Sequence, residues 1–301
     1  MLAQNGVVNS TKNPLQVGTL HWYGANATTQ FPVGSGPEGV VFDGASIWVA
    51  NINGGTLSKL RASDGTVQGT FSVGVGAFAL AYDGANIWVT NSVSNTVTKV
   101  RGSDGVVLGT FGVGHGPGSV AFDGANIWTA NYNDASLTKL RASDGTVLGT
   151  FAAGNSPSGL AFDGANIWTA ELATNTVIKV RASDGTVLGI FSVGSQPRAV
   201  VFDGANIWTA NSNGNTVTEL RASDGTVLGT FAAGTNPSAI AFDGANIWVV
   251  NTFTNGTVTK LRASNGSKIG TFPIGSNSAS VCFDGAHIWV TNEESNTVSK
   301  L

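Results

Sequence analysis

The sequence predicts an all-β protein, a seven-bladed β-propeller with four antiparallel strands in each blade. An aromatic residue followed by Asp-Gly recurs seven times at a spacing of 40, with one extra residue before the last copy. Each copy continues into Ile-Trp, and the conserved spacing places the tryptophans at Trp48, Trp88, Trp128, Trp168, Trp208, Trp248 and Trp289. Seven copies of a period near 40 indicate a ring of repeated units.

Each copy contains four short segments that read as strands. In the fourth copy they cover residues 158–162, 166–170, 176–181 and 186–191, and β-branched and aromatic residues dominate them without any helical period. Asp-Gly-Ala separates the first two segments and Ala-Ser-Asp-Gly separates the last two. Both are hairpin turns, because glycine accepts a positive φ and aspartate bonds its own backbone.

The two ends of the sequence predict how the ring closes. The last copy reaches its third strand at Leu301, and residues 27–34 align with the fourth strand of the first copy. We expect residues 27–34 to complete the last blade, because closure removes the exposed edges of an open array. Residues 1–15 are then a loosely held extension and residues 16–301 a single propeller. Its blade repeats start near residues 35, 75, 115, 155, 195, 235 and 276.

The repeated residues have structural interpretations. Both faces of the middle strands are buried between blades, so the tryptophans are expected to pack at the blade interfaces. The aspartate of each Phe-Asp-Gly, such as Asp123, is expected to bond turn amides. Lys139, Arg141 and Asp144, with their equivalents, are expected to lie on solvated faces with weak ion pairs.

Composition excludes several classes of function. The net charge is −3 and no long basic run occurs, so nucleic acid is not an expected partner. No window of about 18 apolar residues is present, so we expect no membrane span. We expect a monomer that is secreted or periplasmic, with its export signal absent from this sequence, and a cytoplasmic location is the alternative.

The repeats differ mainly on one predicted face. The two tight hairpins of each blade repeat with few changes, whereas the loops between blades and between second and third strands vary. Loops on a rigid scaffold often carry function, although they also tolerate change. The variable-loop face, the predicted binding face, carries Glu38, Phe78, His115, Tyr132, Asp134, Glu171, Arg198, Phe253, Glu293 and Glu294.

Glu171 is the main departure from the repeat. Six copies end the second strand with asparagine, whose amide is expected to cap the loop that follows: Asn51, Asn91, Asn131, Asn211, Asn251 and Asn292. A carboxylate there is costly unless it is paired, and His115 or Arg198 from the flanking blades is the candidate partner. The alternative is that these are scattered polar loop residues.

The segment FDGANIWTAN, followed by a short loop and NTVxKL, resembles the repeats of the YVTN and NHL-type bacterial propellers. The shorter DG-x-x-[IL]-W-x-x-[NE] pattern is also similar to the repeats of virginiamycin B (streptogramin) lyase. The lyase resemblance implies a magnesium-assisted ring opening that uses histidines and a glutamate on one face. Of His21, His115 and His287, only His115 is predicted to lie in such a loop, so His115 and Glu171 are the catalytic candidates.

Three functions remain open at the level of sequence. The first is a non-catalytic scaffold that binds a small molecule, glycan or peptide at the variable-loop face and the central channel mouth. It needs no cofactor and no metal, and no nucleophile–base pair is evident. The second is a lyase or lactone hydrolase at the same face, with a divalent cation such as magnesium. The third is an architectural extracellular component, for which the closed ring offers no obvious edge for assembly.

Overall fold

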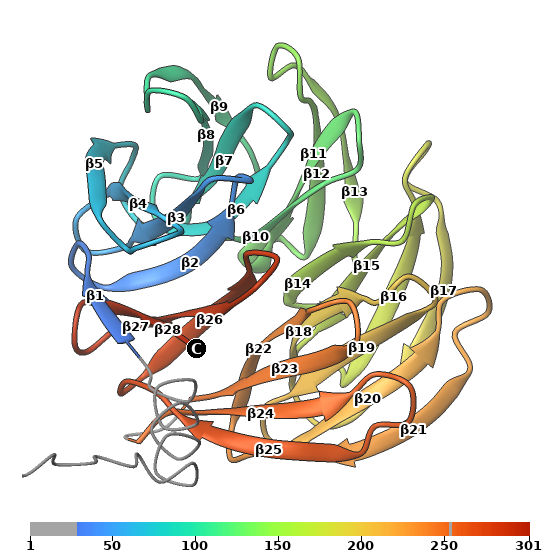
Figure 1. The fold of residues 1–301 in the computed structure, drawn as a ribbon. Helices are drawn as coiled ribbons and strands as arrows, with labels where there is room; N and C mark the ends of the chain where they lie inside the picture. The colour runs from blue at the N-terminus through green and yellow to red at the C-terminus, as the bar shows by residue number, and fades with distance from the viewer. Residues whose placement is uncertain (1–28, 253–254) are drawn as a thin grey trace, which may run out of the picture.

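The computed structural model describes residues 29–252 and 255–301. Seven four-stranded antiparallel sheets are arranged as blades around a central axis, which confirms the predicted seven-bladed β-propeller (Figure 1). In the first six blades, the four strands follow one another in the sequence and lie side by side in the same order in the sheet. The chain therefore builds each blade from the axis outward, as four hairpin-linked strands.

The first three blades are formed by β2 (Pro37–Phe42), β3 (Ser46–Asn51), β4 (Thr56–Arg61) and β5 (Val67–Ser72); β6 (Ala77–Tyr82), β7 (Asn86–Asn91), β8 (Thr96–Arg101) and β9 (Val107–Gly112); and β10 (Pro117–Phe122), β11 (Asn126–Asn131), β12 (Ser136–Arg141) and β13 (Val147–Ala152). A short 3₁₀ turn, η1 (Tyr132–Asp134), joins β11 to β12.

The fourth, fifth and sixth blades are formed by β14 (Pro157–Phe162), β15 (Asn166–Glu171), β16 (Thr176–Arg181) and β17 (Val187–Ser192); β18 (Pro197–Phe202), β19 (Asn206–Asn211), β20 (Thr216–Arg221) and β21 (Val227–Ala232); and β22 (Pro237–Phe242), β23 (Asn246–Asn251), β24 (Thr257–Arg262) and β25 (Lys268–Pro273). The seventh blade combines β26 (Ser278–Phe283), β27 (Ile288–Asn292), β28 (Thr297–Lys300) and β1 (Thr29–Pro32).

The Asp-Gly turn also anchors the repeated tryptophan. In the third blade, Asp123 Oδ1 accepts hydrogen bonds from the backbone amides of Ala125 and Asn126, at 2.9 and 2.6 Å. Its Oδ2 accepts a bond from Trp128 Nε1 at 2.8 Å. Gly124 has a φ of +93°, which a side chain rarely adopts. One aspartate therefore satisfies the turn amides, as expected, and also fixes the indole.

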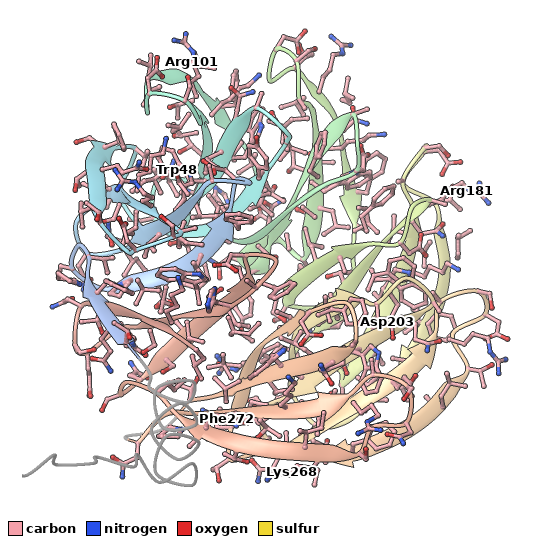
Figure 2. All side chains as sticks on the ribbon, in the orientation of Figure 1. Trp48, Arg101, Arg181, Asp203, Lys268 and Phe272 are labelled. Atoms are coloured by element: carbon pink, nitrogen blue, oxygen red, sulfur yellow. The ribbon has the colours of Figure 1, made fainter. Side chains whose placement is uncertain are left out.

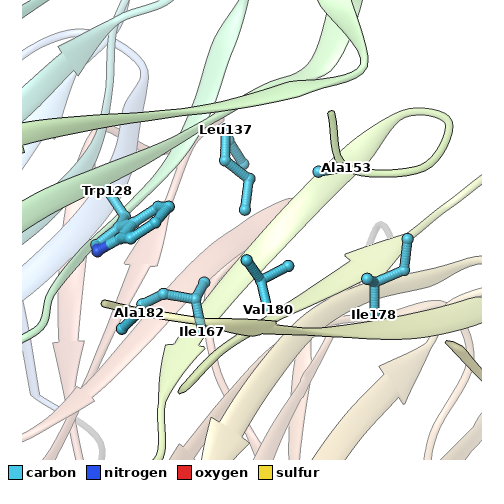
Figure 3. Packing of buried hydrophobic residues seen from close by; sticks show 8 residues of the cluster. Trp128, Leu137, Ala153, Ile167, Ile178, Val180 and Ala182 are labelled. Carbon is cyan, nitrogen blue, oxygen red and sulfur yellow. The ribbon is translucent and has the colours of Figure 1, made fainter. Parts of the chain in front are cut away.

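Hydrophobic side chains of adjacent blades form one cluster at each of the seven seams. Figure 3 shows Trp128 and Leu137 of the third blade against Ile167 and Val180 of the fourth, all fully buried. Phe151 stacks on the same indole, with ring centroids 5.4 Å apart. Burial of an aromatic ring removes roughly 150–250 Å² from water, so these seams hold the ring together.

The repeated lysine is buried, which corrects the expectation of a solvated face. Lys139 is 8% exposed, and its ammonium lies 5.2 Å from the Trp128 ring centroid. Its Nζ donates a hydrogen bond of 2.7 Å to the carbonyl oxygen of Ala182 in the next blade. Only the Arg141–Asp144 pair behaves as expected, at 2.9 Å with both side chains about half exposed. Figure 2 shows the equivalent Arg101 and Arg181 at the rim of the ring.

The strand β1 forms the outer edge of the last sheet. It pairs with β28 in antiparallel register, from Thr29 opposite Lys300 to Pro32 opposite Thr297. Phe31 stacks on Trp289 with ring centroids 5.5 Å apart, as the fourth strand does in the other blades. The expected extension at residues 1–15 lies outside the described residues.

Among the described residues, no helix has the length and the apolar character that a membrane span requires.

Candidate functional site

The seven innermost strands surround a cavity of about 800 Å³ that opens on the variable-loop face. Each of these strands begins with an irregularity in its register. In β14, Pro157 pairs with Glu171 and Gly159 pairs with Ala170, so Ser158 between them has no partner residue. A bulge of this kind redirects a side chain. The first residue inside each bulge lines the cavity: Glu38, Phe78, Gly118, Ser158, Arg198, Ser238 and Ala279.

Loops between the second and third strands complete the cavity wall. Their contributions are Ser92, Tyr132, Asn133, Leu172, Thr252 and Glu293, and Asn277 is added by the loop before β26. Apart from its two acids and one arginine, the described wall is apolar or carries hydroxyl and amide groups. No histidine, cysteine, lysine or aspartate of the described chain lines it. The cavity therefore offers charged, hydroxyl, amide and apolar groups for the recognition of a ligand.

Two acids and one cation face this cavity. Glu38 is half-buried, and its pKa is raised from 4.5 to about 7 by burial first and then by the nearby charge of Glu293. The Glu293 carboxylate accepts a hydrogen bond from the Asn277 side-chain amide. Arg198 on β18 is exposed, and its guanidinium has neither an ion pair nor a hydrogen bond with the described residues. Each charge is therefore open to a ligand.

The structure brings together half of the residues predicted for the binding face. Five of them line the cavity, namely Glu38, Phe78, Tyr132, Arg198 and Glu293. Four others do not line it, namely His115, Asp134, Glu171 and Glu294. Phe253 lies outside the described residues.

His115 pairs with a carboxylate of its own blade. Its Nδ1 lies 2.8 Å from Asp134 Oδ1, and its backbone amide donates to Asp134 Oδ2. The His115 side chain is 68% exposed. The expected pairing of His115 with Glu171 is therefore absent. The two catalytic candidates do not form one group.

Glu171 is fully buried at the end of β15. Thr169 Oγ1 donates a hydrogen bond of 3.2 Å to its Oε1, while its Oε2 has no partner within the described chain. Burial raises the pKa of this carboxyl from 4.5 to about 8. Neither His115 nor Arg198 forms an ion pair with it, so the expected pairing is wrong. At neutral pH the group is mostly an uncharged acid.

The asparagines at this repeat position do not act mainly on the following loop, which corrects the expected capping role. Asn91 is fully buried, and its side-chain amide donates to the hydroxyls of Thr96 and Thr98 on the next strand, at 3.0 and 2.9 Å. These bonds tie the second strand to the third. At Glu171 neither of these bonds is present among the described residues, and its side-chain partner is Thr169 on its own strand.

The lyase resemblance implies a magnesium site that uses histidines and a glutamate, and the described residues hold no such cluster. No group of three or more His, Cys, Asp and Glu side chains converges within the described part of the chain. His287 lies in the tight turn after β26, 3.5 Å from Asp284 on the hairpin side of the blade. His21 is outside the described residues.

Sequence reasoning missed the small residues of the innermost strands and the polar loop residues Ser92, Asn133, Thr252 and Asn277. A signal for the first group was available, because Ser158 and Ser238 occupy the same repeat position as Glu38 and Arg198. That position lines the channel in all seven blades.

The fold and this channel define the class of the molecule as a seven-bladed β-propeller with an open polar channel mouth. Its structure is similar to virginiamycin B lyase from Staphylococcus aureus, with a TM-score of 0.78 and 19% identity, covering 91% of this chain and 98% of that one. A streptogramin B lyase matches with the same score and identity, covering 91% and 96%.

Hydrazine synthase of Kuenenia stuttgartiensis is equally similar, with a TM-score of 0.78 and 19% identity over 98% of this chain and 99% of that chain. These matches confirm the structural similarity to the lyase propellers that the repeats suggested. At this identity they show the shared fold alone. No protein-family model matches the sequence, and no curated protein matches it.

Proposed function

We propose that this protein is a non-catalytic binding module that holds a small ligand in the channel mouth on the variable-loop face. The observation that carries this proposal is the cavity of about 800 Å³, whose wall includes Arg198, an exposed residue whose guanidinium has no partner in the described chain. Small-molecule sites typically have volumes of roughly 300–1,000 Å³ and a few placed polar groups. The volume of this cavity therefore suits a small molecule better than a macromolecule.

The wall supports binding by its chemistry. Phe78 and Tyr132 offer aromatic surface from the second and third blades, and Tyr132 is 41% exposed. Ser158 donates its hydroxyl to backbone carbonyls at 3.1 and 3.2 Å, so its oxygen remains an acceptor for a ligand. All these groups are held on rigid strands or short loops. A ligand therefore meets a wall that is already organised.

The test is a screen of small metabolites, oligosaccharides and short peptides by ligand-observed NMR, followed by calorimetric titration of each hit. We expect saturable one-to-one binding that Arg198→Ala weakens by about tenfold or more, because a charge-assisted hydrogen bond is lost.

The matched control is Arg181→Ala, which removes an arginine from the rim of the ring, 2.9 Å from Asp184 and far along the blade from the channel. It should leave affinity unchanged, and both variants should keep the melting temperature of the wild type. If no compound binds, or if both arginine variants bind equally well, the channel is not the binding site.

A second candidate is a lyase that opens a cyclic lactone at the same face, which the His115–Asp134 pair at 2.8 Å favours. Incubation with virginiamycin B and mass spectrometry tests it. Linearisation that His115→Ala abolishes and His287→Ala preserves supports the lyase. An unchanged substrate counts against it.

A further inference from the structure

The charges at the channel mouth are separated around the ring. Arg198 lies on β18 in the fifth blade, whereas Glu38 lies on β2 in the first and Glu293 follows β27 in the seventh. The innermost strand β18 packs against β14 and β22, and β2 packs against β6 and β26. Figure 1 shows β2 and β18 on different sides of the axis. The wall is thus cationic on one side and acidic on the other.

Neither the cationic side nor the acidic side of the channel has a counter-charge among the described residues. Arg198 has no acidic partner among the described residues, and the Glu38 carboxyl has no hydrogen-bond donor there. The other charged group near Glu38 is Glu293, and their repulsion adds to the effect of burial. A cation placed between them would relieve that repulsion, and an anion on Arg198 would gain a bidentate partner.

The acidic side also offers an aromatic surface. Phe78 occupies the bulge position of β6, next to Glu38 on the neighbouring strand β2. An ammonium group binds well where carboxylates and an aromatic face meet. Hydroxyl-bearing and apolar residues cover the wall between the two charged sides, which suits the uncharged body of a ligand.

We infer that the channel mouth binds a small zwitterion whose amine lies against Glu38 and Glu293 and whose carboxylate pairs with Arg198. Short linear peptides with free termini are the ligand class that fits this charge separation, because their two termini carry opposite charges at opposite ends of a flexible body. This inference rests on the proposed function and specifies its ligand.

The experiment uses linear peptides of two to four residues in four forms: free, N-acetylated, C-amidated, and blocked at both ends. Affinities are measured by calorimetry with the full chain at pH 7. We expect the free form to bind most tightly, with each block costing roughly tenfold or more, since each removes one charge-assisted contact.

Two variants assign each end of the ligand. In Arg198→Ala, the free and C-amidated forms should bind equally, whereas N-acetylation should still weaken binding. In Glu38→Gln, sensitivity to N-acetylation should fall while sensitivity to C-amidation is kept. Glu294→Gln, which changes a carboxylate that does not line the cavity, should behave as the wild type. Melting temperatures confirm that each variant is folded.

The outcomes separate this inference from the proposed function. If all four peptide forms bind equally or not at all, while another small molecule binds in an Arg198-dependent way, the channel is a binding site and the zwitterion assignment is wrong. If blocking one end alone matters, the ligand is a simple anion or cation, which also overturns the assignment. If no compound of any class binds, both proposals are wrong.

Discussion

At the scale of single residues, Glu171 shows how one substitution changes a repeat position. Six asparagines link the second strand to the third by side-chain bonds, as Asn91 does with Thr96 and Thr98. Glu171 occupies the same buried place with one carboxylate oxygen unpartnered. A buried carboxyl without a counter-charge avoids ionisation, because the charged form loses its hydration. Glu171 is therefore a cost to stability whenever it must ionise.

We predict that Glu171→Asn makes stability less dependent on pH. The folded-state pKa of Glu171 is raised from 4.5 to about 8, so the folded chain binds more protons than the unfolded chain between these values. The stability contributed by its protonated form is fully present below pH 4.5 and is lost as pH rises through about 8, with a slope of about 1.4 kcal/mol per pH unit at most. Urea unfolding at pH 5, 6.5 and 8 measures the difference between variant and wild type.

The gain of Glu171→Asn over the wild type should grow towards pH 8, and reach at least about 1 kcal/mol there. Comparing variant with wild type at each pH removes the contribution of Glu38, whose pKa is also raised. The reverse change Asn131→Glu is the matched control in a neighbouring blade, and it should introduce the same pH dependence. Parallel curves for Glu171→Asn and wild type would contradict this account.

At the scale of elements, adjacent blades are joined by the repeated lysine on the third strand. Lys99, Lys139 and Lys179 each donate to a carbonyl of the next blade at 2.7 Å while lying over a tryptophan ring. The fifth blade has Glu219 at this position, 8% exposed and opposite Trp208 in the register. Its pKa is raised by burial and by the charge of Asp203. The seam between the fifth and sixth blades therefore lacks the lysine–carbonyl contact that joins the fourth blade to the fifth.

We predict that Glu219→Lys stabilises the protein by about 1–2 kcal/mol, because it adds a charge-assisted hydrogen bond and a cation–π contact. It also removes a carboxyl that is unfavourable above its ordinary pKa. Asn206, which donates to Glu219 Oε1 at 2.8 Å, is then free to bond its turn aspartate as Asn126 bonds Asp123. Denaturant unfolding at pH 7 measures the change in the free energy of unfolding.

The control for this prediction is Lys139→Glu, which creates the fifth-blade arrangement in the third blade. It should destabilise the protein by a similar amount. A neutral or destabilising Glu219→Lys, together with a costly Lys139→Glu, would mean that the fifth seam is adapted to its glutamate.

At the scale of the whole molecule, the last blade pairs segments from opposite ends of the sequence. Val33 donates its backbone amide to Asn296 at 2.9 Å, and Gly36 donates to the Asn296 side chain at 2.9 Å. Lys300 also reaches the first blade, with Nζ 2.8 Å from the carbonyl of Ala62. These contacts join residues that are far apart in the sequence. Their formation therefore closes a very long loop, which costs conformational entropy.

We predict that deleting residues 1–34 lowers the free energy of unfolding by at least about 3 kcal/mol and promotes aggregation. The deletion removes Phe31 from Trp289 and leaves the edge of β28 unpaired. Thermal unfolding with light scattering measures both effects.

Two comparisons make this test specific. Deletion of residues 1–15 should leave the melting temperature nearly unchanged. Phe31→Ala should cost about as much as Phe111→Ala, whose ring packs on Trp88 in the second blade. A deletion through residue 34 that melts like the full chain would show that β1 is dispensable.

The repeat pattern is enough to predict the number of blades, the strands and the tight turns. These depend on local chemistry that repeats: an aspartate that bonds the amides beside it, a glycine with positive φ, and a tryptophan at a constant spacing. It also indicated which face varies, and half of the predicted face does line the channel. The predictions of a solvated Lys139 and of loop-capping asparagines were wrong. The partners of these side chains are hydroxyls and carbonyls, which a repeat pattern does not specify.

Which of the variable residues line the same cavity depends on the folded ring and cannot be read from the repeats. Glu171 and Arg198 are both unlike their counterparts in the other blades, yet Glu171 is fully buried and Arg198 is exposed and lines the channel. The physical reason is the bulge at the start of each innermost strand, whose first unpaired residue lies on the channel wall in every blade. Only closure of the ring then places Arg198 across the channel from Glu38, because residues in separate blades have no local interaction that sets their arrangement.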